Sequence, residues 1–487
     1  MILIRRPRSC PASLLVDKMK KGLYLTLLLP LLAGALEFNG VFQSNMVLQR
    51  GVPLTISGKA SPGEKITLSF AGHTLKGTAA QDGSWRLVLP ALEGSGKNRS
   101  MILQGKDKKI VLENILIGEV WFCSGQSNMH WKLFQSLNGK EIASRSDYPQ
   151  IRTLMVDANT SVKPLESFKG SWRPLTPGNA GKLSGVGFFF ARELYRQLGI
   201  PIGLVCVTRG GTMIEPWTPG DAWEPYPAVK KQVEQIYKKT PGQKPRLQDW
   251  IQNQPHLIYN GAIHPLRHIT CRGVIWYQGC SNVWNDTEEI YFLKQKALFE
   301  GWKKAFDAPE LKFYLVQLAP LKRPARYVRK HVDIWLAQQR FADTVRNVRM
   351  AVINDVGDLN NIHPVNKEPV GLRLARIALK YDYGRQVKAD FPRPEKYIRK
   401  GSTVELAFRH ASGWKTTDGK AVRNFETAGR DGKFHEAKAE ISGKYLKISA
   451  PQVDKPVAIR YMYDACKMGN LVNEAGLPPG TFEVQIK

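Results

Sequence analysis

Residues 120–131 read Val-Trp-Phe-Cys-Ser-Gly-Gln-Ser-Asn-Met-His-Trp, an apolar run followed by a polar turn that contains glycine. The apolar run has the length of a buried strand, and Gly125 permits a tight turn after it. Such a turn can present the hydroxyl and the backbone N–H of Ser127 toward a cleft. Ser127 is therefore either a nucleophile or a polar residue that ends a strand.

The sequence around this stretch alternates between strands and helices. Apolar strands are predicted at residues 202–207, 273–277, 313–317 and 350–354, and helices at 186–198, 290–306 and 369–381. This alternation is typical of an α/β domain with a parallel sheet. In such a sheet, ligands bind beyond the carboxyl ends of the strands, which is where Ser127 would lie.

Short runs of alternating apolar and polar residues, separated by turn signals, lie on both sides of the α/β region. This pattern predicts β domains. We therefore expect four segments: an upstream extension with a signal peptide at 1–35, an N-terminal β-sandwich at 36–117, the α/β domain at 118–388 and a C-terminal β domain at 389–487.

The first segment has the pattern of a secretory signal. Met19-Lys20-Lys21 precedes an apolar run at 22–35 that ends in Ala33-Gly34-Ala35, which predicts cleavage near Ala35 and a periplasmic or secreted protein. The residues before Met19 fit either an upstream start codon or an extended basic region. The run is short for a membrane helix and no later segment resembles one, so we expect no stable membrane insertion.

The chain carries a formal net charge of +29, and removal of the first 35 residues leaves roughly +24. This charge favours acidic partners, such as an anionic polysaccharide or a membrane surface. The lysines and arginines are dispersed along the chain, as in a generally basic exported protein, and form no arm with interleaved aromatic residues. The sequence therefore argues against nucleic-acid binding. It predicts no particular oligomeric state.

Five cysteines remain after the predicted cleavage site, and no two of them form a Cys-x-x-Cys pair. The odd number and low density predict a fold without a disulfide framework, and the spacing predicts no zinc site. Cys123 and Cys206 lie in apolar runs and are expected to be small core residues. We expect no metal and no cofactor.

Three further polar loops follow predicted strands, as the Ser127 turn does. Residues 208–217 contain the pair Gly210-Gly211, which can offer a bare backbone N–H to an oxyanion. Residues 277–282 place the amides of Gln278 and Asn282 beyond the next strand. Residues 355–364 contain His363, the best candidate for the base that a serine nucleophile requires. Four such loops, each after a strand of one sheet, argue against coincidence and favour Ser127 as a nucleophile with His363 as its base.

The same motifs, in the same order, resemble the sialate O-acetylesterase family of SGNH-type serine esterases. The resemblance extends from Phe38 to the end of the chain, and it is carried by these motifs: Asn45-Met-Val-Leu-Gln-Arg50, Gly118-Glu-Val-Trp-Phe-Cys-Ser-Gly-Gln-Ser-Asn-Met129, Gly210-Gly-Thr212, Glu215-Pro-Trp217, Tyr259-Asn-Gly261, Trp276-Tyr-Gln-Gly279, Ile362-His-Pro364, Asn366-Lys367 and Asn473-Glu-Ala-Gly-Leu477.

The resemblance implies a flavodoxin-like catalytic domain flanked by β domains, acting on O-acetyl esters of sialate or other sugars without a metal. It makes Ser127 the nucleophile and His363 the general base. The backbone N–H groups of Ser127 and Gly211, with an amide of Gln278 or Asn282, would form the oxyanion hole. The partner is an O-acetylated sugar or glycan. Residues that either face the sugar or belong to the core are Arg209, Trp131, Trp217, Trp276 and Trp284.

Two positions depart from the family pattern. Cys280 stands where relatives often carry an acid, and Asn360 stands where the Asp of Asp-x-x-His is common. An Asp normally orients the imidazole and stabilises its cation. Here Asp355, Asp358, Asn360 or a backbone carbonyl would have to orient His363. The departures also allow an alternative function, a catalytically impaired esterase homologue that binds carbohydrate.

Overall fold

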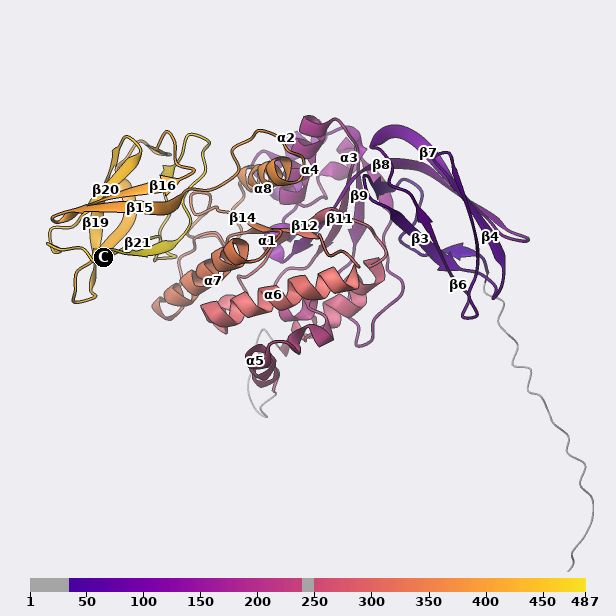
Figure 1. Ribbon diagram of the computed structural model, residues 1–487, viewed down its shortest axis with the longest axis horizontal. Helices are drawn as coiled ribbons and strands as arrows, with labels where there is room; N and C mark the ends of the chain where they lie inside the picture. Colours follow the sequence, from indigo (N-terminus) through magenta and orange to yellow (C-terminus); the bar gives the residue numbers. More distant parts are fainter. Residues whose placement is uncertain (1–34, 239–248) are drawn as a thin grey trace, which may run out of the picture.

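A computed structural model describes residues 35–238 and 249–487 of the chain. The predicted signal peptide, except for its last residue Ala35, lies outside the described residues. Figure 1 shows three regions in a row: an N-terminal β region (indigo), a central α/β region and a C-terminal β region (yellow). Within the described residues no helix is both long and apolar enough to cross a bilayer.

The N-terminal region consists of antiparallel strands with one buried face. Alternate residues of β4 and β6 are buried, as the alternating sequence predicts, and Leu68 and Leu89 are completely inaccessible. Its strands are β1 (Glu37–Phe38), β3 (Leu54–Lys59) and β6 (Ser84–Leu89) in one sheet, and β4 (Lys65–Phe70), β5 (His73–Thr78) and β7 (Ser95–Gln104) in a second sheet that continues into the central region.

Strand β8 (Lys109–Gly125) joins the two regions without a break. Its first half pairs antiparallel with β7 and alternates between exposed and partly buried residues, whereas its second half is buried throughout. The change occurs because the second half has neighbours on both faces of the sheet. The domain boundary predicted between residues 117 and 118 therefore falls inside one continuous strand.

The central region is built on a mostly parallel sheet with the strand order β10-β9-β11-β8-β12-β13-β14. Only β10 runs antiparallel, and β2 (Val47–Gln49) adds a parallel pairing to β8. The strands are β9 (Tyr148–Val156), β10 (Trp172–Leu175), β11 (Ile202–Thr208), β12 (Gly273–Tyr277), β13 (Lys312–Val316) and β14 (Val348–Ala351). The four strands predicted from the sequence correspond to β11, β12, β13 and β14.

Helices cover both faces of this sheet. Helix α4 (Gly185–Leu198) packs against α8 (Glu368–Tyr381) on one face, and α6 (Glu288–Ala305) packs against α7 (Ala325–Thr344) on the other (Figure 1). Three of these helices match the predicted ones, whereas α7 was not predicted. The shorter helices are α1 (Ser127–His130), α2 (Gly139–Ser144), α3 (Pro177–Ala180) and α5 (Pro227–Tyr237), with single turns at Leu133–Gln135, Glu215–Trp217, Gly220–Trp223, Ile251–Asn253, Tyr259–Ile263, His264–Leu266 and Asn282–Trp284.

The C-terminal region contains a seven-stranded antiparallel sheet in the order β15-β16-β20-β19-β18-β21-β23. Its loops support the α/β region: Asn354, just after β14, donates to the carbonyl of Pro479 at 2.7 Å. The strands are β15 (Arg393–Lys400), β16 (Thr403–Arg409), β18 (Val422–Ala428), β19 (Phe434–Ser442), β20 (Tyr445–Ser449), β21 (Ala458–Tyr461) and β23 (Phe482–Gln485), with a separate pair of β17 (Lys415–Thr416) and β22 (Leu471–Val472).

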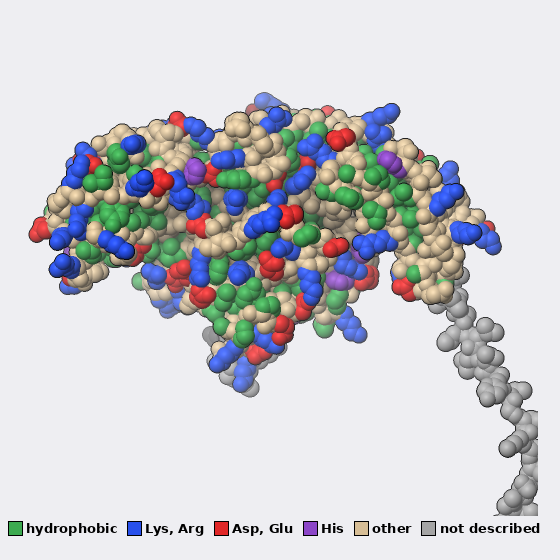
Figure 2. All heavy atoms as spheres, in the orientation of Figure 1, with side chains coloured by type: hydrophobic (Ala, Val, Ile, Leu, Met, Phe, Trp, Pro, Cys, Tyr) green, Lys and Arg blue, Asp and Glu red, His purple; other side chains and the backbone are tan. Residues whose placement is uncertain are grey.

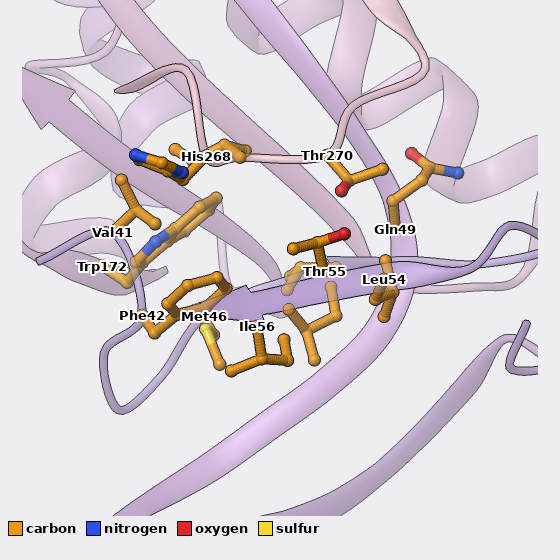
Figure 3. A pocket seen from close by; sticks show the side chains of 13 residues that line it. Val41, Phe42, Met46, Gln49, Leu54, Thr55, Ile56, Trp172, His268 and Thr270 are labelled. Carbon is orange, nitrogen blue, oxygen red and sulfur yellow. The ribbon is translucent and has the colours of Figure 1, made fainter. Parts of the chain in front are cut away.

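The N-terminal and central regions meet at an apolar contact. Figure 3 shows Trp172 of β10 close to Phe42, with Met46 and Ile56 beside them. A cavity of about 20 Å³ remains between these side chains. That volume holds about one water molecule, so the cavity is a packing gap and not a sugar site.

Lysine and arginine side chains are spread over the visible face of the molecule, with aspartates and glutamates between them (Figure 2). They form no single basic stripe on this face. On this face, therefore, the basic residues are dispersed in space as they are in the sequence.

Candidate active site

The predicted functional loops lie at one edge of the parallel sheet. Gly125 of β8 pairs with Thr208 of β11 on one side and with Tyr277 of β12 on the other. The strands therefore end level with one another, and the loops that follow them start side by side. This register brings residues far apart in the sequence into one site.

The turn after β8 depends on Gly125 and Gln126. Gly125 has a φ of +137°, and a Cβ there would lie 2.3 Å from the carbonyl oxygen of Tyr277, so only glycine fits. The side-chain oxygen of Gln126 accepts from the backbone N–H of Gly279 at 2.9 Å. These contacts join the turn to the β12 loop and leave Ser127 half-buried at the start of α1.

The glycine pair after β11 lies directly beside Ser127. A Cβ built on Gly210 would lie 3.5 Å from the Cβ of Ser127, and Gly211 has a φ of +69° that favours glycine. In the described part of the chain, the backbone N–H groups of Ser127 and Gly211 donate no hydrogen bond within the protein. Both groups are available to an oxyanion.

The side-chain amides of Gln278 and Asn282 donate hydrogen bonds within the protein. The Gln278 amide donates to the carbonyl of Thr212 at 3.2 Å and to Oδ1 of Asn282 at 2.7 Å. The Asn282 amide donates to Glu215 at 3.2 Å and to Asp286 at 2.8 Å. Both hydrogens of each amide have partners within the protein, so in this arrangement neither side chain has a free donor for an oxyanion.

Gln278 and Asn282 instead hold the β11 and β12 loops together. Asn282 Oδ1 accepts from the backbone N–H of Ile214 at 3.0 Å, and Gln278 Oε1 accepts from the hydroxyl of Tyr291 at 2.8 Å. Both amide side chains are completely buried. They act as positioning residues for the loop that carries Gly211.

A buried charge cluster lies behind these amides. Lys294 of α6 donates to Glu215 at 2.6 Å and to Asp286 at 2.7 Å, and all three side chains are inaccessible to solvent. Burial alone would lower the pKa of Lys294, but the two carboxylates outweigh it and raise that pKa. Asn282 bonds to both carboxylates, so the cluster is continuous with the loops around the site.

The carboxylates expected to orient His363 bind other groups. Asp355 pairs with Arg373 through two contacts of 2.7 Å, and Asp358 accepts from the backbone N–H of Asn360 at 2.9 Å. Among the described residues, no hydrogen bond joins Asp358 or Asn360 to the imidazole of His363. The prediction that Asp358 or Asn360 orients the ring is therefore not supported by the geometry.

His363 is held by its backbone and by an aromatic contact. The backbone N–H of His363 donates to Oδ1 of Asn361 at 2.9 Å. Its ring stacks on Trp131, with centroids 5.0 Å apart and an angle of 26° between the planes. Trp131 follows Ser127 by four residues, so this contact places the imidazole beside the segment that carries the candidate nucleophile.

If His363 is the base for Ser127, kcat/KM for a neutral acetyl ester should rise with pH along an acid limb whose midpoint lies below pH 6.5. Burial, and secondarily the charge of Lys367, lowers the pKa of His363 from the usual 6.5, because both disfavour the imidazolium. The neutral ring that accepts a proton therefore persists below that pH. A pH–rate profile measures the midpoint, and a value above 6.5 contradicts His363 as the base in this environment.

The tryptophans divide between core and surface. Trp217 and Trp276 are buried, so they belong to the core and do not face a sugar. Trp284 is 40% exposed and Trp250 is 50% exposed. The sequence interpretation missed Trp250, although Gly211 places it beside the site: a Cβ on Gly211 would lie 3.7 Å from the Trp250 ring.

The remaining candidates behave as ordinary structural groups. Arg209 donates to the carbonyl of Ala158 at 2.6 Å, and Cys123 and Cys206 are buried in the core as predicted. Cys280 is also buried. Within residues 35–238 and 249–487, no three His, Cys, Asp or Glu side chains cluster as metal ligands would.

Comparison with known proteins gives concordant matches. Residues 117–380 match the family model described as carbohydrate esterase, sialic acid-specific acetylesterase. The sialate O-acetylesterases of Homo sapiens and Pongo abelii are each 29% identical over 423 residues, which cover 77% of this chain and 78% of each relative. The crystal structure of a carbohydrate acetylesterase from Xanthomonas citri superposes with a TM-score of 0.81 at 30% identity, covering 93% of this chain and 100% of that one.

Proposed function

Because this chain belongs to the family of sialic acid-specific acetylesterases, which are carbohydrate esterases, we propose that it removes acetyl groups from sugars with Ser127 as nucleophile and His363 as general base. Two contacts around Ser127 carry this assignment. The bare Gly210-Gly211 backbone approaches the Cβ of Ser127, and Trp131, four residues after Ser127, stacks on the ring of His363.

The mechanism that fits this arrangement is a two-step acyl transfer. Ser127 Oγ attacks the acetyl carbonyl while the imidazole of His363 takes its proton, and the backbone N–H groups of Ser127 and Gly211 bind the oxyanion. His363 then protonates the leaving sugar hydroxyl. In the second step a water molecule attacks the acetyl-enzyme, and the same groups release acetate. Each oxyanion donor contributes roughly 3 kcal/mol to the transition state.

The pair Ser127–His363 is a dyad in this proposal. No carboxylate of the described residues bonds to the imidazole, and the ring is oriented by its stack on Trp131 and by the loop that carries it. A dyad requires a well-positioned histidine, because the imidazolium formed during attack lacks an anionic partner.

We assign the central region to the flavodoxin-like SGNH fold. The order β11-β8-β12-β13-β14 corresponds to 2-1-3-4-5 in a doubly wound sheet, and β9 adds a strand outside β11. All these pairings are parallel, and the proposed site lies at the carboxyl ends of the strands, where such sheets bind ligands. Export through the predicted signal peptide remains part of the proposal.

Replacement of Trp250 by alanine is expected to raise KM for an acetylated oligosaccharide by about 5- to 30-fold. Loss of a half-exposed aromatic face beside Gly211 removes roughly 1–2 kcal/mol of apolar contact with the sugar ring. The KM for p-nitrophenyl acetate, which has no sugar, should stay unchanged. Steady-state kinetics on both substrates measures the difference, and Trp250→Phe, which keeps a ring, is the matched control. Equal changes on both substrates would exclude a sugar contact.

Two measurements test the proposed function as a whole. A fluorophosphonate should label the purified protein at Ser127, as located by mass spectrometry of the labelled peptide. Acetate should be released from at least one member of a panel of O-acetylated sialates, xylo-oligosaccharides and pectins. If neither labelling nor acetate release occurs in folded protein, the chain is a carbohydrate-binding homologue without activity.

A further inference from the structure

Lys367 is a buried cation beside the proposed nucleophile. It lies four residues after His363, at the start of α8, and only 2% of its surface is exposed. Its Nζ donates to Oδ1 of Asn128 at 2.6 Å and lies 5.9 Å from the ring centre of Trp131. In the described part of the chain no carboxylate lies within 4.0 Å of this ammonium group, so it has no counter-ion.

Asn128 links Lys367 to the loop that carries His363. It follows Ser127 directly, it is 1% exposed, and its Nδ2 donates to the carbonyl of Ile362 at 2.9 Å. That carbonyl belongs to the peptide unit that leads into His363. A second bond, from the N–H of Leu137 to the carbonyl of Val365 at 2.9 Å, docks the same loop on the other side of the histidine.

We propose that Lys367 is the positioning residue that aligns His363 with Ser127, acting through Asn128. This inference rests on the proposed function, because it takes Ser127 and His363 as the reacting pair. The ammonium form of Lys367 can only donate hydrogen bonds, so its contact decides which end of the Asn128 amide faces it. The Nδ2 end then has to face Ile362, and the backbone before His363 is held at a fixed distance from the residue after Ser127.

The charge of Lys367 distinguishes this role from simple packing. Burial lowers the pKa of Lys367 to about 7, and the Cys280 thiol opposes that shift. The other titratable groups around Lys367 are His363 and Tyr277, whose ring centre lies 5.7 Å from Nζ. The positive charge of Arg323 acts on Cys280 and opposes the rise of its pKa by burial. A methionine of similar length would avoid the desolvation of a cation. A buried lysine at this position therefore lowers the free energy of unfolding relative to methionine, which is consistent with a functional role.

Two variants, Lys367→Met and Asn128→Asp, test the chain of contacts that runs from Lys367 through Asn128 to Ile362. Asn128→Asp keeps an acceptor for Lys367 but removes the donor to Ile362. Each variant is expected to lower kcat for p-nitrophenyl acetate by about 10- to 100-fold, with little change in KM, because a displaced base weakens proton transfer in the transition state. The double variant should be no slower than the slower single variant, since both break one chain of contacts. Lys367→Arg, which keeps the donor and the charge, should recover part of the lost kcat.

The pH profile provides a readout that packing would not move. Removal of the ammonium group in Lys367→Met raises the pKa of His363, so the acid limb of kcat/KM should shift to higher pH, and it should stay in place in Lys367→Arg. The melting temperature of Lys367→Met should remain within about 5 °C of the wild type. Lys140→Met, at an exposed lysine of α2, is the matched control and should behave as wild type.

The inference is wrong if Lys367→Met keeps the wild-type kcat and acid limb, or if its activity falls only in proportion to the loss of folded protein. It is also wrong if the effects of Lys367→Met and Asn128→Asp multiply. These results are separate from a failure of the proposed function, which would show as an absence of fluorophosphonate labelling and acetate release in the wild type.

Discussion

Replacement of Ser127 by alanine is expected to lower kcat for acetyl ester hydrolysis by about four to six orders of magnitude. Alanine removes the atom that attacks the carbonyl, so no acetyl-enzyme can form. The backbone N–H groups of residues 127 and 211 remain, and they leave a small residual rate through water attack. Acetate release by the purified variant measures the loss, and fluorophosphonate labelling should disappear with it.

The matched control for this variant is Ser144→Ala, at an exposed serine of α2, which should keep wild-type kinetics. The Ser127→Ala variant should also keep the wild-type melting temperature, because its half-buried hydroxyl has no hydrogen bond within the described residues. A Ser127→Ala variant with more than about a hundredth of the wild-type kcat would contradict the assignment of the nucleophile.

Replacement of Lys294 by methionine is expected to destabilise the protein by about 3–5 kcal/mol. The variant leaves Glu215 and Asp286 as two buried carboxylates without their shared cation. Their negative charges then repel each other at low local dielectric, and either a carboxyl group takes up a proton or the chain opens. Urea denaturation followed by tryptophan fluorescence measures the change.

The pH dependence of this variant has a defined sign. Burial raises the pKa of Asp286, and Lys294 opposes that rise, so in Lys294→Met the folded-state pKa of Asp286 lies still further above that of the unfolded chain. The variant's stability deficit should therefore be smallest in acid and grow as the pH rises toward neutrality. Lys304→Met on the same helix, at an exposed lysine paired with Asp221, should change stability by less than about 1 kcal/mol. Similar losses in both variants would contradict the account of the cluster.

Most of the secondary structure around the site was predictable from the sequence. The strands β11, β12 and β13 carry continuous hydrophobic runs, and the run at 350–354 overlaps the second half of β14. Helices α4, α6 and α8 carry helical periods that place their boundaries within two residues. Helix α7 was missed. Its buried face includes His331 and Gln338, polar residues that weaken the apolar signal although they pack inside.

The sequence alone identified the loops that we propose carry the chemistry of this site. Ser127, Gly211 and His363 each follow an apolar strand in a short polar motif, and local patterns of this kind also identify the family. The tertiary structure decided what the surrounding side chains do. Asn282 bonds to Glu215 across 67 residues, and Lys367 bonds to Asn128 across 239. Hydrogen bonds between buried polar groups depend on the distances that folding creates, and no local pattern encodes those distances. For that reason the bonding partners of the Gln278 and Asn282 amides, and the contact of Lys367 with Asn128, could not be predicted from the sequence.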